Sequence, residues 1–141
     1  MFDKILLPTD GSEFSEHEVE RAIKALSDDG EIIILSVASK LSATTPFQSK
    51  KNIARMNKGF LEEAHDNVNR MAERFDERVN VRKMVKVGIP SDTIVDVAEK
   101  EDVDLIIISA SGKSGLHKFF IGSVAERVLK STERDVLLIH N

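Results

Sequence analysis

Five short apolar segments recur along this chain, and segments with helical periodicity separate them. Four of the five are continuous or nearly so: residues 5–7, 32–37, 103–108 and 136–139. Continuous apolar runs are typical of strands that are covered on both faces. Their alternation with helices predicts an α/β fold, a three-layer, doubly wound open parallel sheet of five strands with right-handed crossovers.

The remaining apolar segment, residues 79–87, alternates between valines and polar residues, which predicts a half-exposed strand at a sheet edge. Helices are predicted over residues 15–27, 50–77, 91–101 and 123–131, where apolar residues recur at three- and four-residue steps. The predicted inner faces comprise Val19, Ala22, Ile23 and Leu26; Ile53, Met56, Phe60, Leu61, Ala64, Val68, Met71, Ala72 and Phe75; Ile94, Val95, Val97 and Ala98; and Val124, Val128 and Leu129.

Composition excludes several classes of protein. The length of 141 residues suits one domain of roughly 100–200 residues, so residues 1–141 are expected to form a single domain. The net charge of -4 argues against a nucleic-acid partner, and the absence of cysteine excludes disulfides and zinc–thiolate sites. No apolar stretch approaches the roughly 20 residues of a membrane span, and the N-terminus lacks a secretory pattern. We therefore expect a cytoplasmic protein without membrane contact.

Residues 39–52 form a polar segment without clear periodicity. Loops of this length are uncommon in compact domains unless they are functional or mobile. A plain flexible connection and a lid or regulatory loop both remain open.

The candidate site lies where strands end. Ligands of open parallel sheets bind beyond the carboxyl ends of the strands, at the point where the strand order reverses. If the first and fourth strands are neighbours, residues 8–12, 37–39, 109–115 and 122–123 converge on one crevice. A P-loop is excluded because Ile107 stands where its first glycine is required, and a dinucleotide fingerprint is excluded because only Gly11 follows the first strand.

The remaining glycines suit a phosphate. Gly112 and Gly122 allow close backbone approach and positive φ, and Ser123 opens a helix whose N-terminal N–H groups attract anions. Lys113, His117 and Lys118 add positive charge between them, while Asp10 suits a ribose hydroxyl. Alternatively, Ser123 and Glu126 form an ordinary capping box, and Asp10 is a turn former or helix cap.

In these motifs the sequence resembles the universal stress protein family over essentially its whole length. The family motif G-x-x-G-x(9)-G-[S/T] is matched by Gly112, Gly122 and Ser123, and its turn after the first strand by residues 8–10. The resemblance implies the strand order 3-2-1-4-5, ATP or AMP binding in one branch of the family, and a homodimer through the fifth strand. One position departs from the motif, because Ser109 replaces its first glycine and either crowds the ribose or bonds to it.

The resemblance also implies roles for residues. Pro8, Thr9 and Asp10 would line the adenine and ribose end, Val37 would offer backbone groups to adenine, and Gly112, Gly122 and Ser123 would hold the phosphates. Ile108, Ser109 and Val124 complete the predicted nucleotide-binding set. We expect no metal ligands from the protein itself, so Mg²⁺ would enter only with the nucleotide.

The leading hypothesis is a nucleotide-binding stress-response regulatory module that acts on an unidentified protein partner. A slow ATPase is the first alternative, although the four histidines are scattered and His117 is the one plausible participant. The second alternative is a ligand-free dimeric interaction protein, in which Ser109 marks a lost site. The apolar strand 136–140 independently predicts a homodimer, because an uncovered apolar edge invites symmetric pairing.

Overall fold

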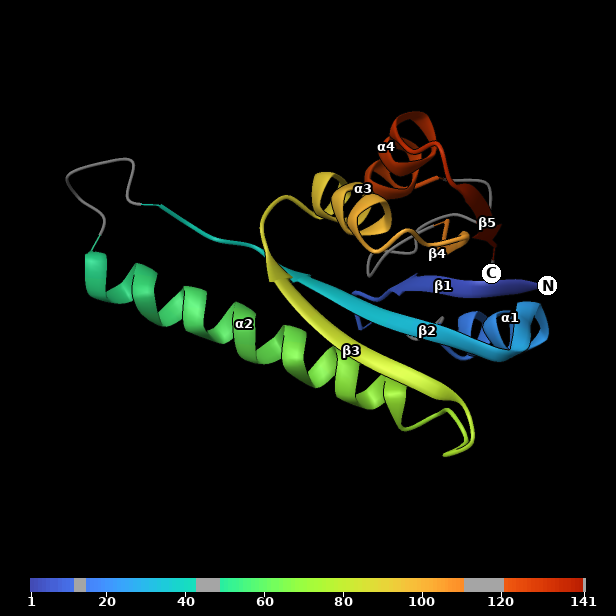
Figure 1. Cartoon of the computed structure of the whole chain (residues 1–141). Helices are drawn as coiled ribbons and strands as arrows, with labels where there is room; N and C mark the ends of the chain where they lie inside the picture. Colours follow the sequence, from blue (N-terminus) through green and yellow to red (C-terminus); the bar gives the residue numbers. More distant parts are fainter. Residues whose placement is uncertain (12–14, 43–48, 111–120, 141) are drawn as a thin grey trace.

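The protein forms a twisted parallel sheet covered by helices on both faces (Figure 1). The structure is a computed structural model, and it describes residues 1–11, 15–42, 49–110 and 121–140. The elements are β1 (Phe2–Pro8), α1 (Ser15–Ala25), β2 (Leu26–Ala38), α2 (Lys50–Ala72), β3 (Asn80–Val87), α3 (Pro90–Lys100), β4 (Leu105–Ser109), α4 (Ser123–Ser131) and β5 (Asp135–Ile139).

The sheet has the order β3-β2-β1-β4-β5, with every pairing parallel. The predicted fold class and strand order are therefore confirmed. Leu6 on the central strand β1 pairs with Ile33 on β2 and with Ile106 on β4. The chain leaves β1 toward β2 on one side and returns to β4 on the other, so the strand order reverses beside β1.

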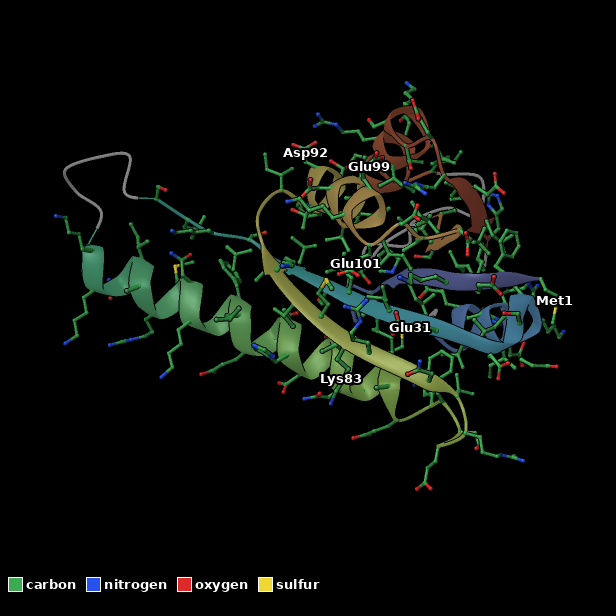
Figure 2. All side chains as sticks on the ribbon, in the orientation of Figure 1. Met1, Glu31, Lys83, Asp92, Glu99 and Glu101 are labelled. Carbon is green, nitrogen blue, oxygen red and sulfur yellow. The ribbon has the colours of Figure 1, made fainter. Side chains whose placement is uncertain are left out.

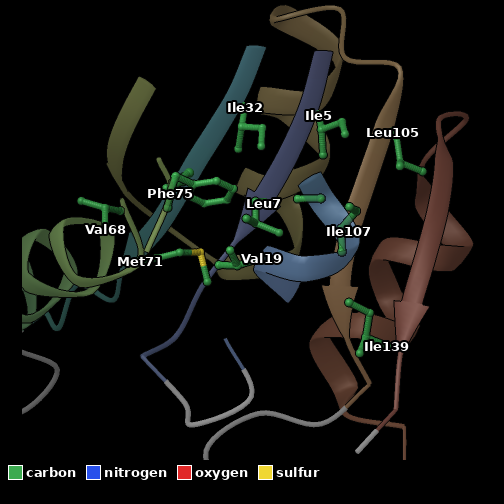
Figure 3. Packing of buried hydrophobic residues seen from close by; sticks show 12 residues of the cluster. Ile5, Leu7, Val19, Ile32, Val68, Met71, Phe75, Leu105, Ile107 and Ile139 are labelled. Atoms are coloured by element: carbon green, nitrogen blue, oxygen red, sulfur yellow. The ribbon is translucent and has the colours of Figure 1, made fainter. Parts of the chain in front are cut away.

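Two apolar layers fill the space between sheet and helices. On one face, Ile5, Leu7 and Ile107 pack with residues of α1 and α2 (Figure 3). On the other face, Leu6, Ile33 and neighbouring strand residues pack with residues of α3 and α4. Alternate side chains of β1 point into opposite layers, and both sets are fully buried. This two-sided burial explains the continuous apolar runs of β1, β2 and β4. The same expectation is wrong for β5, which lies at the other edge of the sheet and is only partly buried.

Strand β3 occupies one edge of the sheet, as its alternating sequence predicted. Arg82 of β3 donates to Glu101 Oε2 at 2.7 Å and to Glu31 Oε1 at 3.2 Å. Figure 2 labels Glu31, which is itself on β2, and Glu101, which follows α3. This pair of bonds ties the C-terminal end of α3 to the edge strand.

Several predicted helix boundaries and inner faces were wrong. Helix α1 ends at Ala25 and Leu26 already begins β2, while α2 ends at Ala72. Four residues predicted to face inward are substantially exposed: Ile23, Met56, Leu61 and Leu129. At Ile23 and Leu129 the apolar stripe is wider than the line of contact with a flat sheet, so its margins remain in water. Met56 and Leu61 precede Ala64, the first buried residue of α2.

Helix α2 extends beyond the sheet toward the predicted linker (Figure 1). Its first buried residue is Ala64, fourteen positions after its start at Lys50. Asn57 holds the end of the preceding segment by accepting from the Leu41 N–H at 2.7 Å and donating to the Leu41 carbonyl at 2.9 Å. The lid interpretation of residues 39–52 depends on residues 43–48, which lie outside the described residues.

Candidate functional site

A cavity of about 580 Å³ lies at the carboxyl ends of β1, β2 and β4, where the strand order reverses. This is the position at which open parallel sheets bind ligands, and the volume suits a small molecule. Its wall includes nine residues of the predicted set: Pro8, Thr9, Asp10, Val37, Ile108, Ser109, Gly122, Ser123 and Val124. Gly112 lies outside the described residues. The convergence is a structural fact, while the roles of these residues in binding remain predictions.

The turn after β1 has a defined shape. The Thr9 N–H donates to the Leu35 carbonyl at 2.8 Å, and the Thr9 hydroxyl accepts from the Gly11 N–H at 3.1 Å. Gly11 has a φ of +80°, and a Cβ there would clash with the side chain of Asn67. Asp10 is consequently held at the exposed tip of the turn, on the cavity wall. The alternative of Asp10 as a helix cap is wrong, because the residue after a cap must be helical and Gly11 has a positive φ.

The start of α4 forms another part of the wall. Gly122 is the N-cap residue, with φ -62° and ψ 154°, so the expectation of a positive φ is wrong at this position. Its N–H donates to the Ala110 carbonyl at 2.6 Å, and its carbonyl accepts the first helical bond, from the Glu126 N–H at 3.0 Å. Gly122 thus joins the helix to the end of β4, and its N–H is not directed at a ligand.

The capping-box alternative at Ser123 is also wrong. Ser123 is the first helical residue, and no side chain of the described residues caps α4. Glu126 instead accepts from Lys130 Nζ at 2.9 Å, and this hydrogen bond lowers the pKa of Glu126. The next three residues of the first turn, Ser123, Val124 and Ala125, all line the cavity. Their N–H groups precede the first intrahelical donor, and such orphan donors are suited to an anion.

Helices α2 and α3 supply walls that the sequence did not assign to the site. Phe60, Glu63, Ala64 and Asn67 of α2 and Pro90 and Ile94 of α3 complete the cavity. Phe60 and Ala64 belonged to the predicted apolar stripe of α2, but the stripe alone cannot show which of its residues reach past the sheet. These walls are mainly apolar, and apolar walls suit a flat ring such as a nucleobase.

The described wall contains two carboxylates, Asp10 and Glu63, and no Lys or Arg. Lys113, His117 and Lys118, which the sequence proposed as a source of positive charge, lie outside the described residues. A second hollow of about 580 Å³ at the amino ends of the strands is lined by Asp28, Asp29 and Asp76, and by Arg78, which pairs with Asp76. Among the described residues no strand carboxyl end or helix N-terminus lines this second hollow, so the first cavity is the better site for an anionic ligand.

One titratable group beside the cavity was missed by the sequence analysis. Glu18 of α1 is only 3% exposed. Burial raises the pKa of Glu18 to about 8, and the nearby charge of Asp10 also raises it. Hydrogen bonds from the Ser109 hydroxyl and backbone N–H lower this pKa, but their effect is smaller than that of burial. The sequence could have indicated that Glu18 is buried, because Glu18 lies on the same inner face of α1 as Val19 and Ala22.

Within the described ranges, no three His, Cys, Asp or Glu side chains are placed to hold a metal ion together. The same ranges contain no helix that is both long and apolar enough to cross a bilayer.

Comparison with known proteins points to one family. The model of the universal stress protein family matches residues 1–140. Universal stress protein MJ0531 of Methanocaldococcus jannaschii is 33% identical, and the match covers 99% of this chain and 82% of that protein. The solved structure of MJ0577 from the same organism is 32% identical with a TM-score of 0.82, covering 99% of this chain and 96% of that one. A family member from Arabidopsis thaliana, At3g01520, was solved with AMP bound; it is 18% identical with a TM-score of 0.67, covering 96% of this chain and 90% of that one.

Proposed function

Because this chain belongs to the universal stress protein family, we propose that it is a stress-response module that binds ATP or AMP in the cavity beside β1. The observation that carries this proposal is the first turn of α4. The first three residues of α4 line a cavity at the point where the sheet reverses its strand order, and no described side chain caps their N–H groups.

Each part of an adenine nucleotide matches one part of the wall. The apolar surfaces of Val37, Ile94 and Phe60 suit the adenine ring, and the exposed carboxylate of Asp10 suits the ribose hydroxyls. The phosphates would lie against Ser123 and the start of α4. In this arrangement Mg²⁺ enters with the nucleotide phosphates, because the described residues offer no metal site of their own.

A thermal-shift titration with ATP and AMP, with and without Mg²⁺, tests the proposal. Ligand at a hundred times its dissociation constant adds about 2.7 kcal/mol, which raises the melting temperature of a domain of this size by roughly 5–10 °C. Gly122→Val should abolish the rise, because it adds bulk at a residue that lines the cavity, while the backbone angles of Gly122 suit any residue. Gly59→Val is the matched control, because Gly59 lies on α2 with nothing near its Cβ position. No rise with millimolar ATP or AMP would overturn the proposal.

We also propose that two copies pair through β5 (Asp135–Ile139), which the sequence predicted as the strand 136–140. This strand lies at the sheet edge, and Leu137 on it is 36% exposed. Edge strands with apolar residues favour pairing with a second chain. Light scattering should give twice the monomer mass of 15.7 kDa, and Leu137→Lys should return the monomer. A wild-type monomer at micromolar concentration would contradict the dimer.

A slow ATPase is the alternative that the same titration leaves open. Multiple-turnover hydrolysis of ATP that Gly122→Val abolishes would establish it. Nucleotide binding without turnover would instead support a sensor that passes its state to a protein partner.

A further inference from the structure

Glu18 lies one layer behind the cavity wall, where a carboxyl group is unusual. It projects from α1, which packs against β1, β2 and β4. The core residues of those strands on this face are apolar: Ile5, Leu7, Ile32, Ile34, Leu105 and Ile107. A side chain that is 3% exposed in such surroundings is either neutral or paired with a positive charge.

The partner of Glu18 is Ser109, the last residue of β4. The Ser109 hydroxyl and backbone N–H both bond to the Glu18 carboxyl. Ser109 also lines the cavity and pairs with Ile139 of β5. It therefore separates the cavity from the buried carboxyl, and its hydroxyl is directed away from a ligand.

The charged group that acts on Glu18 among the described residues is Asp10, in the turn after β1. Asp10 is itself acidic, so it opposes the ionisation of Glu18. The neighbouring charged residues of α1, Glu20 and Arg21, are exposed. No described cation compensates a negative charge on Glu18, and burial moves its ionisation to about pH 8.

We propose that Glu18 is a positioning residue of the nucleotide site: in its neutral form it holds Ser109 at the back of the cavity, and its ionisation weakens the binding of nucleotide phosphates. A neutral carboxyl accepts the Ser109 N–H and retains a proton to donate. An ionised carboxyl adds a second negative charge beside Asp10, behind a wall where water screens little. This inference rests on the proposed function and adds proton linkage to it.

Calorimetric titration of AMP between about pH 7 and pH 9.5 tests the inference. The second ionisation of a phosphate monoester is near pH 6, so the charge of AMP is nearly constant in this range. The wild-type dissociation constant should rise at least about threefold once the pH exceeds about 8, because each pKa unit of coupling corresponds to a tenfold change. Glu18→Gln should bind AMP with no such rise. Glu20→Gln, an exposed change on the same helix, should behave as wild type.

Two further measurements separate charge from structure. Adenosine lacks phosphate, so its wild-type affinity should vary less than that of AMP over the same range. Ser109→Ala removes a hydrogen bond that lowers the pKa of Glu18, so the rise in the dissociation constant should begin at a higher pH than in wild type.

The possible failures are distinguishable. An AMP affinity that is flat with pH in wild type, or that falls equally in wild type and Glu18→Gln, overturns the role of Glu18 and leaves nucleotide binding intact. Absence of AMP binding by every variant at every pH overturns the proposed function and this inference with it.

Discussion

Replacing Glu18 with Gln provides a quantitative test of the buried carboxyl that needs no ligand. Gln keeps the shape and hydrogen-bonding capacity of a neutral carboxyl but cannot ionise. The pKa of Glu18 is about 8 in the folded protein, against 4.5 for the solvent-exposed carboxyl group in an unfolded chain. Since the folded pKa is the higher one, the contribution of Glu18 to stability is fully present below pH 4.5 and is lost as the pH rises to about 8.

The size of this loss follows from the two pKa values. Proton linkage gives a cost to the folded state of about 1 kcal/mol at about pH 5.5 and roughly 4–5 kcal/mol at about pH 8.5. The free energy of unfolding of wild type should therefore fall by about 3 kcal/mol relative to that of Glu18→Gln across this range. With a urea dependence of about 1–3 kcal/mol per molar, the difference between the two unfolding midpoints should change by about 1–3 M.

Urea unfolding of both proteins at the two pH values, without nucleotide, measures this difference directly. Comparing the two proteins at each pH removes the contribution of every other titrating group, because those groups are shared. A difference in unfolding free energy that stays constant within about 0.5 kcal/mol would refute the reasoning, since it would mean that Glu18 is already ionised in the folded protein at about pH 5.5, as it is in the unfolded chain.

Three other predictions concern packing and backbone shape. Leu6→Ala on the central strand, where Leu6 is fully buried, should lower the free energy of unfolding by about 2–5 kcal/mol in a urea titration. Gly11→Ala should lower the melting temperature, because the φ of Gly11 is +80° and a Cβ there would clash with Asn67. Gly59→Ala, in the exposed part of α2, should raise the free energy of unfolding by up to about 1 kcal/mol. Asn57→Ala should speed hydrogen exchange at the Leu41 amide by at least about fivefold while leaving the melting temperature nearly unchanged, because it removes both bonds that hold this segment.

Much of the fold was predictable because burial on both faces leaves a direct mark on sequence. The sequence predicted that β1 and β4 are central strands, because their apolar runs are continuous. It predicted that β3 is an edge strand, because its apolar and polar residues alternate. Helix limits were less predictable. Leu26 continues the apolar stripe of α1, but in the structure it begins β2 and pairs with Phe2. Whether Leu26 belongs to a helix or to a strand is decided by its pairing with Phe2, which the local sequence does not reveal.

The candidate site, like the fold, was predictable from the sequence only in part. Strand ends converge by topology, so Asp10 and Ser109 could be placed near one another from the sequence. The contribution of α2 depends on how far that helix extends past the sheet, which periodicity does not reveal. At Gly122 the sequence suggested a donor to phosphate, yet its N–H is taken by the Ala110 carbonyl. Such a bond between residues twelve positions apart is set by the packing of α4 on β4.

A titration of AMP into ¹⁵N-labelled protein, followed by amide chemical shifts, tests most directly whether a nucleotide binds in the cavity beside β1. We predict saturable shifts of the Ser123, Val124 and Ala125 amides, accompanied by those of Thr9 and Asp10 in the turn after β1, which lines the same cavity. Shifts confined to the acidic hollow near Asp28 and Asp29, or no shifts at millimolar AMP, would contradict the account.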